Sequence, residues 1–265
     1  KQETRLTQVG DRRVLQIVPF CLRKDLLDTA ELDQDIGEWL ESFETSRMLI
    51  RWLSASLALQ HGGVCSLYLH GPARVGKSML VQGVAECFHA QPVPGAQAFS
   101  EFNGGLFESP VVMIDEGLPS RTNGLDIADM FRSLVTGGPI SVMKKHQNAL
   151  VSKIPYRLIF AANSFDMVKQ LIGRRTMAPQ DREAGRERIL VLDTGTAPAD
   201  YLDSHGAMDF TRHSQKGSWI GGECRLARHL IKLYQMAFEE SPFVRAGRLL
   251  VEGVSHPAFT MQFDL

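Results

Sequence analysis

The chain has 265 residues, of which 44% are hydrophobic and 22% charged, and its formal net charge is −1. This length allows a sizeable core, and the composition is that of a globular protein rather than a disordered or fibrous one. The near-neutral charge excludes a strongly basic protein, so contact with nucleic acid would have to depend on a local basic cluster. No apolar run reaches the roughly 18 residues of a membrane span, and no signal-peptide pattern is present, so we expect no membrane partner.

The first residues predict a mostly helical N-terminal segment, residues 1–62. Residues 14–18 form its one strand-like run, and residues 37–59 carry apolar side chains at helical spacing until glycines at 62 and 63 end the run. The chain begins with Lys1 rather than Met, so we expect it to be part of a longer polypeptide.

Residues 63–196 predict an α/β domain. Short aliphatic runs alternate with helical segments, and each run is followed by polar turn residues, as in a buried parallel sheet. The expected strands cover residues 64–69, 111–114, 157–162 and 189–192, with a helix over 77–88. The C-terminal segment, residues 197–265, returns to loops and one helix over 223–238.

Residues 71–78 have the sequence of a phosphate-binding loop, between a predicted strand and a predicted helix. Glycines let backbone N–H groups turn toward phosphate oxygens, and the helix adds its positive N-terminal end. Lys77 would reach the β- and γ-phosphates, and the Ser78 hydroxyl would bind Mg²⁺. We therefore expect ATP on Gly71, Pro72, Ala73, Arg74, Val75, Gly76, Lys77 and Ser78.

Two further strand ends supply polar groups for hydrolysis. The strand over 111–114 ends at Asp115, which would hold or lie beside Mg²⁺, and Glu116, which would orient and deprotonate water. Such a carboxylate pair favours hydrolysis over phosphoryl transfer by a small-molecule kinase. Asn163 closes the strand over 157–162, and a polar residue there in AAA+ ATPases helps to position water. A GTPase is excluded, because Ser164 stands where a guanine-binding motif needs lysine.

Residues 134–153 predict a β-hairpin with a basic tip. Apolar and polar residues alternate on both sides of a break that contains Lys144, Lys145 and His146. A basic tip suits sequence-independent contact with the phosphate backbone of single-stranded DNA. A solvated loop is the alternative interpretation of this cluster.

The order of these motifs resembles that of the superfamily 3 helicases, the AAA+ motors of small DNA viruses and of phage and plasmid primase–helicases. The resemblance covers roughly residues 67–193. Residues 71–78 match the family's Walker A motif, 111–116 its Walker B, 137–146 its B′ motif and Asn163 its motif C.

The resemblance implies an AAA+ P-loop NTPase core with a parallel sheet flanked by helices, a helical lead-in and a small helical tail. It also implies a homo-hexameric ring that hydrolyses ATP with Mg²⁺ and moves along single-stranded DNA, which Lys145 and His146 would follow. A primase, fused or separate, is a further partner that it allows. The compartment would be the cytoplasm of a bacterium carrying a phage or plasmid, or a host cell for a virus.

A ring ATPase needs a cation from the neighbouring subunit to stabilise charge on the γ-phosphate. Arg188, just before the last predicted strand, is the first candidate, and Arg186 is the second. These arginines could instead balance acidic neighbours such as Glu183 and Glu187 on a surface loop.

Two other functions compete with the helicase. An AAA+ replication initiator or loader would remodel DNA or partners without processive unwinding, and a nucleotide-gated oligomerisation module would not hydrolyse ATP. The oligomerisation module is disfavoured by the intact Lys77, Asp115, Glu116 and Asn163. The spacings of the remaining histidines and of the four cysteines predict no metal site, and the cysteines are expected to be reduced thiols.

Overall fold

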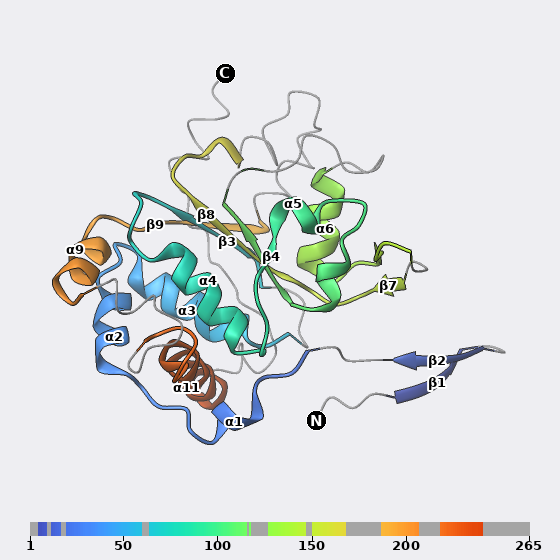
Figure 1. The fold of residues 1–265 in the computed structure, drawn as a ribbon, viewed down its shortest axis with the longest axis horizontal. Coiled ribbons are helices and arrows are strands. Elements are labelled where there is room, and N and C mark those ends of the chain that lie inside the picture. The colour runs from blue at the N-terminus through green and yellow to red at the C-terminus, as the bar shows by residue number, and fades with distance from the viewer. Residues whose placement is uncertain are drawn as a thin grey trace.

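The centre of the molecule is a five-stranded parallel sheet. In the computed structural model, which describes residues 5–9, 12–16, 20–59, 64–115, 117, 127–146, 150–167, 187–206 and 218–240, its strand order is β4-β5-β8-β3-β9 (Figure 1). The strands are β4 (Val93–Pro94), β5 (Val111–Ile114), β8 (Arg157–Ala162), β3 (Ser66–His70) and β9 (Ile189–Asp193). The predicted α/β core with a parallel sheet is confirmed.

Helices cover the sheet. The remaining elements of this core are α4 (Lys77–Glu86), α5 (Gly95–Ala98), the 3-10 helix η1 (Gly104–Phe107) and α6 (Ile127–Thr136). Helix α4 packs against β5 and β8, and α6 also packs against β8. All six residues of β8 are buried, because this strand lies inside the sheet and has helices packed on it.

The N-terminal segment contains helices, as predicted, and also a pair of strands. The helices are α1 (Lys24–Leu27), α2 (Gln34–Glu41) and α3 (Ser46–Ser56), so the helical periodicity of residues 37–59 is divided between two helices. The side chain of Asp33 caps α2 by accepting from the Ile36 N–H. The strand predicted over 14–18 lies slightly earlier, as β2 (Arg12–Gln16), and pairs antiparallel with β1 (Arg5–Val9).

The last described helix, α11 (Arg225–Glu240), packs against the first ones. It lies against α1, α3 and α4 (Figure 1). Arg225 at its start donates to both carboxylate oxygens of Asp33, at 2.6 and 2.9 Å, and to Asp35 at 2.8 Å. These charge-assisted bonds fix the C-terminal helix to the beginning of α2. Another C-terminal helix, α9 (Ala197–Ser204), packs against α2.

A buried histidine in α11 makes the stability of the fold depend on pH. His229 is 3% exposed, its Nδ1 accepts from the Asp33 N–H at 2.9 Å, and burial lowers the pKa of the ring to about 4. Between pH 6.5 and 4 the unfolded chain binds a proton that the folded chain does not, so we expect stability to fall as the pH falls. The slope from this residue is at most about 1.4 kcal/mol per pH unit. Urea unfolding at several pH values measures it.

The matched variant for this pH prediction is His229→Gln, which keeps an acceptor for the Asp33 N–H but does not titrate. It should remove most of the slope. Equal slopes in the wild type and in His229→Gln would contradict the assignment.

A buried arginine connects the start of β8 to the end of α3. Arg157, at the start of β8, is 1% exposed, and its guanidinium donates to the carbonyls of Ser56 at 2.7 Å and Ala58 at 2.9 Å. Burial lowers its pKa to about 10. Its hydrogen bonds satisfy the carbonyls at the end of α3.

The four cysteines are free thiols, and Cys65, Cys87 and Cys224 are buried. Burial raises the pKa of Cys65 to about 12, so this thiol is not a thiolate at neutral pH. Within the described ranges no group of three His, Cys, Asp or Glu residues could hold a metal ion. None of the helices described in the structure has the length and apolarity needed to cross a bilayer.

Candidate nucleotide-binding site

The sheet order brings three of the predicted motifs to one edge. Gly71 follows β3, Asn163 follows β8 and Asp115 follows β5, and these three strands are neighbours in the order β5-β8-β3. Ala162 pairs with His70, and the Gly71 N–H donates to the Ala162 carbonyl at 3.2 Å. Because the strands are parallel, their carboxyl ends meet at this edge, with Asn163 between the other two motifs.

The loop before α4 needs glycine at positions 71 and 76. Gly76 has φ +89°, and a Cβ there would lie 2.6 Å from Cζ2 of Trp39. Gly71 has φ +151°, and a Cβ there would lie 2.0 Å from the Thr194 hydroxyl oxygen. The loop is therefore held between α2 and the segment after β9, and only glycine fits these two positions.

The loop ends at a helix start that is open to an anion. Helix α4 begins at Lys77, its N-cap is Gly76 in the left-handed region, and no side chain caps it. The first N–H groups of a helix have no partner within the helix and carry partial positive charge. Val75 is fully buried and anchors the loop, while Ser78 and residues 72–74 are exposed. This arrangement fits a phosphate chain.

Lys77 points into the loop. Its Nζ donates to the carbonyls of Gly71 and Pro72, both at 2.7 Å, and to Oδ1 of Asn163 at 2.9 Å. The side chain is 7% exposed, and burial lowers its pKa. Lys77 and Asn163, far apart in sequence, are therefore parts of one site.

Aromatic contacts hold the turn that carries Asn163. The Tyr68 hydroxyl donates to the Ser164 carbonyl at 2.5 Å, and the His70 ring stacks on Phe165 with centroids 3.8 Å apart. His70 Nδ1 also lies 2.7 Å from the Asp193 carboxylate. These residues were not predicted as part of the site, because the only signal they give in the sequence is a place at or near a strand end.

Of the other residues predicted for this site on or near the strands, only some lie within the described part of the chain. Asp115 is exposed at the carboxyl end of β5, on the same edge as the loop. Glu116 and Arg186 lie outside the described residues.

Arg188 lies at the opposite edge of the sheet from the loop. Its carbonyl accepts from the N–H of Ser66 at 2.8 Å and from the Ser66 hydroxyl at 2.7 Å, at the start of β3. The loop begins after the other end of β3, about 13 Å away for four strand rises. The Arg188 backbone is thus distant from the chain's own phosphate loop.

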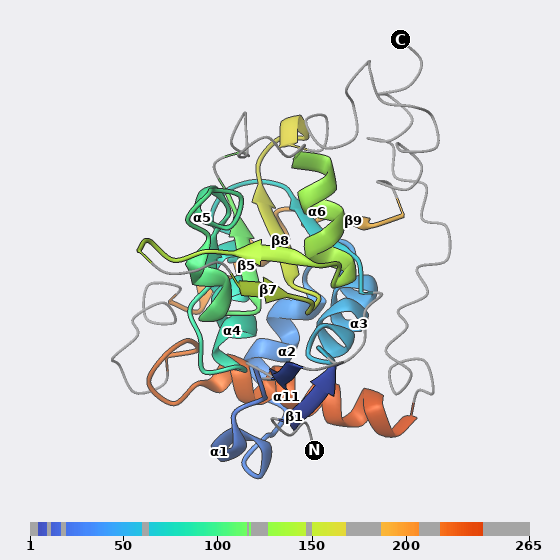
Figure 2. The ribbon, with the colours of Figure 1, turned by 90° about the vertical axis from the view of Figure 1, so that its right-hand side faces the viewer.

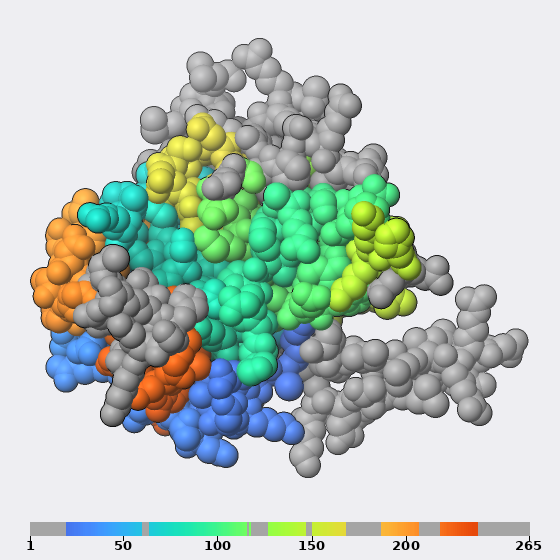
Figure 3. All heavy atoms as spheres, viewed as in Figure 1, coloured from blue at the N-terminus to red at the C-terminus, as the bar shows by residue number. Residues whose placement is uncertain are grey.

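The predicted hairpin is present between β5 and β8. Its strands, β6 (Ile140–Val142) and β7 (Leu150–Ser152), pair antiparallel. The hairpin lies on the side of the molecule away from α9 (Figures 1 and 2) and stands at the surface (Figure 3).

The three basic residues of the hairpin differ in their contacts. Lys144 is half-buried, and its Nζ is paired with the Glu108 carboxylate at 2.7 Å. Lys145 and His146 are exposed in a turn, with His146 at φ +64°. The cluster predicted from sequence therefore contains one lysine of the stem and two residues of the turn.

Two aromatic side chains of the C-terminal segment have structural contacts. His205 stacks on Tyr201 with ring centroids 4.1 Å apart, and Trp219 is fully buried, with its ring 5.3 Å from that of Trp39. His213 lies outside the described residues.

The fold and the loop define the class: this chain has an α/β fold of the P-loop NTPase type. Residues 69–176 match a family model described as a family of unknown function, DUF5906. No curated protein matches the sequence.

Solved structures resemble the fold at low sequence identity. The A form apo structure of the NrS-1 C-terminal region is 14% identical, with a TM-score of 0.54 over 89% of this chain and 53% of that one. Another apo structure of that region (305–718) has a TM-score of 0.49, 14% identity, and covers 87% of this chain and 49% of that one. An inhibitor-bound JCV helicase has a TM-score of 0.44 at 14% identity, over 91% of this chain and 65% of that one. The chain thus spans about half the length of the NrS-1 region.

Proposed function

We propose that this chain is the ATP-hydrolysing motor of a replicative DNA helicase that works as a hexameric ring on single-stranded DNA. The observation that carries the proposal is the meeting of Lys77 and Asn163 at one sheet edge, with Asp115 on the neighbouring strand. A P-loop site with these residues, and a basic hairpin inserted between β5 and β8, is the combination expected of superfamily 3 motors. The similarity to structures titled as a helicase is in line with it.

In this proposal the chain's own residues bind ATP and prepare it for attack by water. The N–H groups of residues 71–78 and the start of α4 hold the phosphates, and Lys77 exchanges its carbonyl partners for phosphate oxygens. Ser78 and Asp115 would hold Mg²⁺, which neutralises charge on the phosphates when it is bound. Glu116 takes the proton from water, and Asn163 orients that water.

The ring would complete each site at a subunit boundary. Arg188 is about 13 Å from its own loop by strand length, and this separation supports a role in a neighbour's site. Arg186 remains the second candidate. Mixing Arg188→Ala subunits with Lys77→Ala subunits tests the assignment, because a finger acting across the boundary lets mixed rings recover activity that neither variant has alone. No recovery would contradict it.

The hairpin would contact the DNA backbone through its turn. We expect Lys145→Ala combined with His146→Ala to weaken DNA-stimulated hydrolysis, since each basic contact with phosphate contributes to binding. Basal hydrolysis without DNA should persist. The measurement is ATP turnover as a function of oligonucleotide concentration at two salt concentrations, and the salt dependence should become less steep in the variant.

Lys144→Ala is the comparison within the hairpin, because that lysine is already paired with Glu108. This change should weaken the stimulation of ATP hydrolysis by DNA less than the combined Lys145→Ala and His146→Ala change does. A wild-type protein that hydrolyses ATP without stimulation by DNA and displaces no annealed strand would contradict the helicase. That result would favour an initiator or loader instead.

A further inference from the structure

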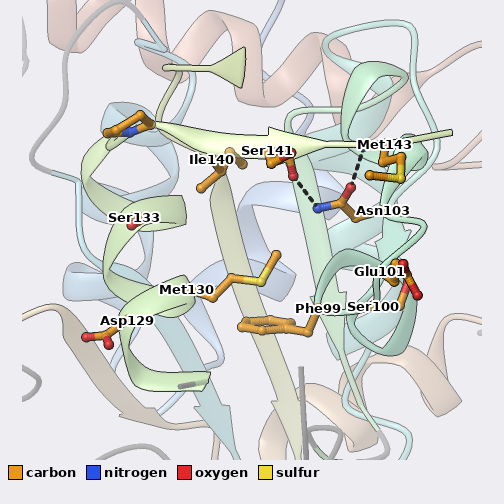
Figure 4. A pocket seen from close by; sticks show the side chains of 11 residues that line it. Phe99, Ser100, Glu101, Asn103, Asp129, Met130, Ser133, Ile140, Ser141 and Met143 are labelled. Carbon is orange, nitrogen blue, oxygen red and sulfur yellow. Dashed lines mark hydrogen bonds between the residues drawn. The ribbon is translucent and has the colours of Figure 1, made fainter. Parts of the chain in front are cut away.

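Asn103, which belongs to none of the predicted motifs, holds the stem of the basic hairpin. It is 2% exposed and immediately precedes η1. Its Nδ2 donates to the Ser141 carbonyl at 3.0 Å, and its Oδ1 accepts from the Met143 N–H at 2.9 Å (Figure 4). One buried amide thus bonds to two backbone groups of the chain entering the turn.

These two bonds take the place of hydrogen bonds that a neighbouring strand would make to β6. In an antiparallel pair, alternate residues direct both backbone groups toward the partner strand. Ser141 and Met143 direct theirs to Asn103, so Ile140 and Val142 are the residues that face β7. Asn103 therefore satisfies the outer edge of β6, which would otherwise need a partner strand or water.

Packing is incomplete on one side of this part of the hairpin. A cavity of about 330 Å³ lies between α6, β6 and the segment around Asn103, and Ser141 and Met143 are among its lining residues (Figure 4). Ile140 and Met130 border the same space. Ile140 and Val142 hold β6 on the core side, and because side chains do not fill this volume, the two bonds of Asn103 hold the side of the strand that faces it.

The same segment also holds the other strand and leads into the candidate site. The Ser152 hydroxyl lies 3.1 Å from the Tyr156 hydroxyl, which donates to the Leu106 carbonyl at 3.0 Å. Glu108 pairs with Lys144. Only two residues separate Glu108 from β5, which ends beside Asp115. Residues 103–108 thus connect both hairpin strands to β5.

We propose that Asn103 is a positioning residue that fixes the hairpin relative to β5 and so couples DNA contact at the turn to ATP hydrolysis. The inference rests on the proposed function in taking single-stranded DNA as the ligand of the turn. The hydrogen bonds of Asn103 do not depend on that proposal.

The test uses the whole chain with Asn103→Ala and Asn103→Asp. The aspartate keeps the size and the acceptor for the Met143 N–H, but it has no donor for the Ser141 carbonyl. We expect unchanged hydrolysis without DNA. In Asn103→Ala the oligonucleotide concentration for half-maximal stimulation should rise about thirtyfold, since two buried hydrogen bonds contribute about 1 kcal/mol each. Ser133→Ala, a change in the same cavity that leaves Asn103 in place, should behave as the wild type.

Hydrogen exchange supplies a readout that does not depend on DNA. A peptide covering residues 140–146 should exchange faster in both variants, while one covering 77–86 should not change. Wild-type exchange and wild-type stimulation in Asn103→Ala would overturn the inference. Failure of both variants to fold would also overturn it, because Asn103 would then be needed for the core. If the wild type shows no DNA stimulation, the proposed function fails, and exchange alone decides whether Asn103 holds the hairpin.

Discussion

Replacing Lys77 with alanine is expected to lower ATP turnover by roughly 100-fold or more, the usual cost of losing one donor that stabilises transition-state charge. The side chain is buried in the loop and contacts Gly71, Pro72 and Asn163. Loss of the ammonium group removes the cation that contacts these three residues. Single-turnover hydrolysis with saturating ATP and Mg²⁺ separates this loss from weaker nucleotide binding.

The matched control for that experiment is Lys24→Ala, the same change on the exposed side of α1. It should leave turnover unchanged. Circular dichroism must show that Lys77→Ala is folded, because two loop carbonyls lose their partner. Turnover near the wild-type value in folded Lys77→Ala would contradict the catalytic assignment and with it the proposed ATPase.

Truncation of Trp39 should be the most damaging change to stability. Its side chain is fully buried, lies edge-on to Phe43 at 5.3 Å and packs against Trp219 at 5.3 Å. We expect Trp39→Ala to cost about 3–5 kcal/mol, as for other large-to-small changes in a core. The melting temperature should fall by about 10 °C. Because Cζ2 of Trp39 borders Gly76, the rise in melting temperature caused by ATP should also shrink.

Trp52 provides the comparison for Trp39. It is equally buried, but its Nε1 donates to the Cys65 carbonyl at 2.8 Å, whereas the Nε1 of Trp39 has no hydrogen-bond partner within the described part of the chain. Trp39→Phe should therefore be tolerated better than Trp52→Phe. Trp52→Ala should destabilise the fold yet keep the full shift caused by ATP. A larger loss of stability in Trp39→Phe than in Trp52→Phe would contradict the role given to the Trp52 hydrogen bond. A smaller shift caused by ATP in Trp52→Ala than in Trp39→Ala would contradict the contact of Trp39 with the loop.

The strands were the most predictable part of the fold. The apolar runs of β5 and β8 match their predicted bounds because polar or turn residues limit each run in the sequence. The break between α2 and α3 was not predictable, since Phe43 continues the helical spacing. Distant contacts produce it: the Thr45 hydroxyl donates to the Asp193 carbonyl, and the Glu44 N–H donates to that of Thr194. Strand β4 was missed because it has only two residues, one of them a proline.

Some residues of the candidate site could likewise be predicted from the sequence, and others could not. Residues 71–78 could be assigned from sequence because their chemistry requires a fixed local spacing. The contact between Lys77 and Asn163 was implied only by resemblance, and the strand order β5-β8-β3 brings the two together. Asn103 could not have been found, because an isolated asparagine before two glycines reads as a turn. Its role depends on a partner 38 residues later in the chain.

The pairing of Arg225 with Asp33 and Asp35 has a consequence for how this protein can be divided. A fragment limited to residues 63–196 would contain every predicted ATPase motif, but it would lack both Trp39 and Trp219. The face of α4 that packs on α11 would then be open to water, and Gly76 would lose the indole beside it. The shortest fragment suited to expression therefore runs from α1 through α11. It keeps the helices on both sides of residues 63–196, which pack together next to the phosphate loop.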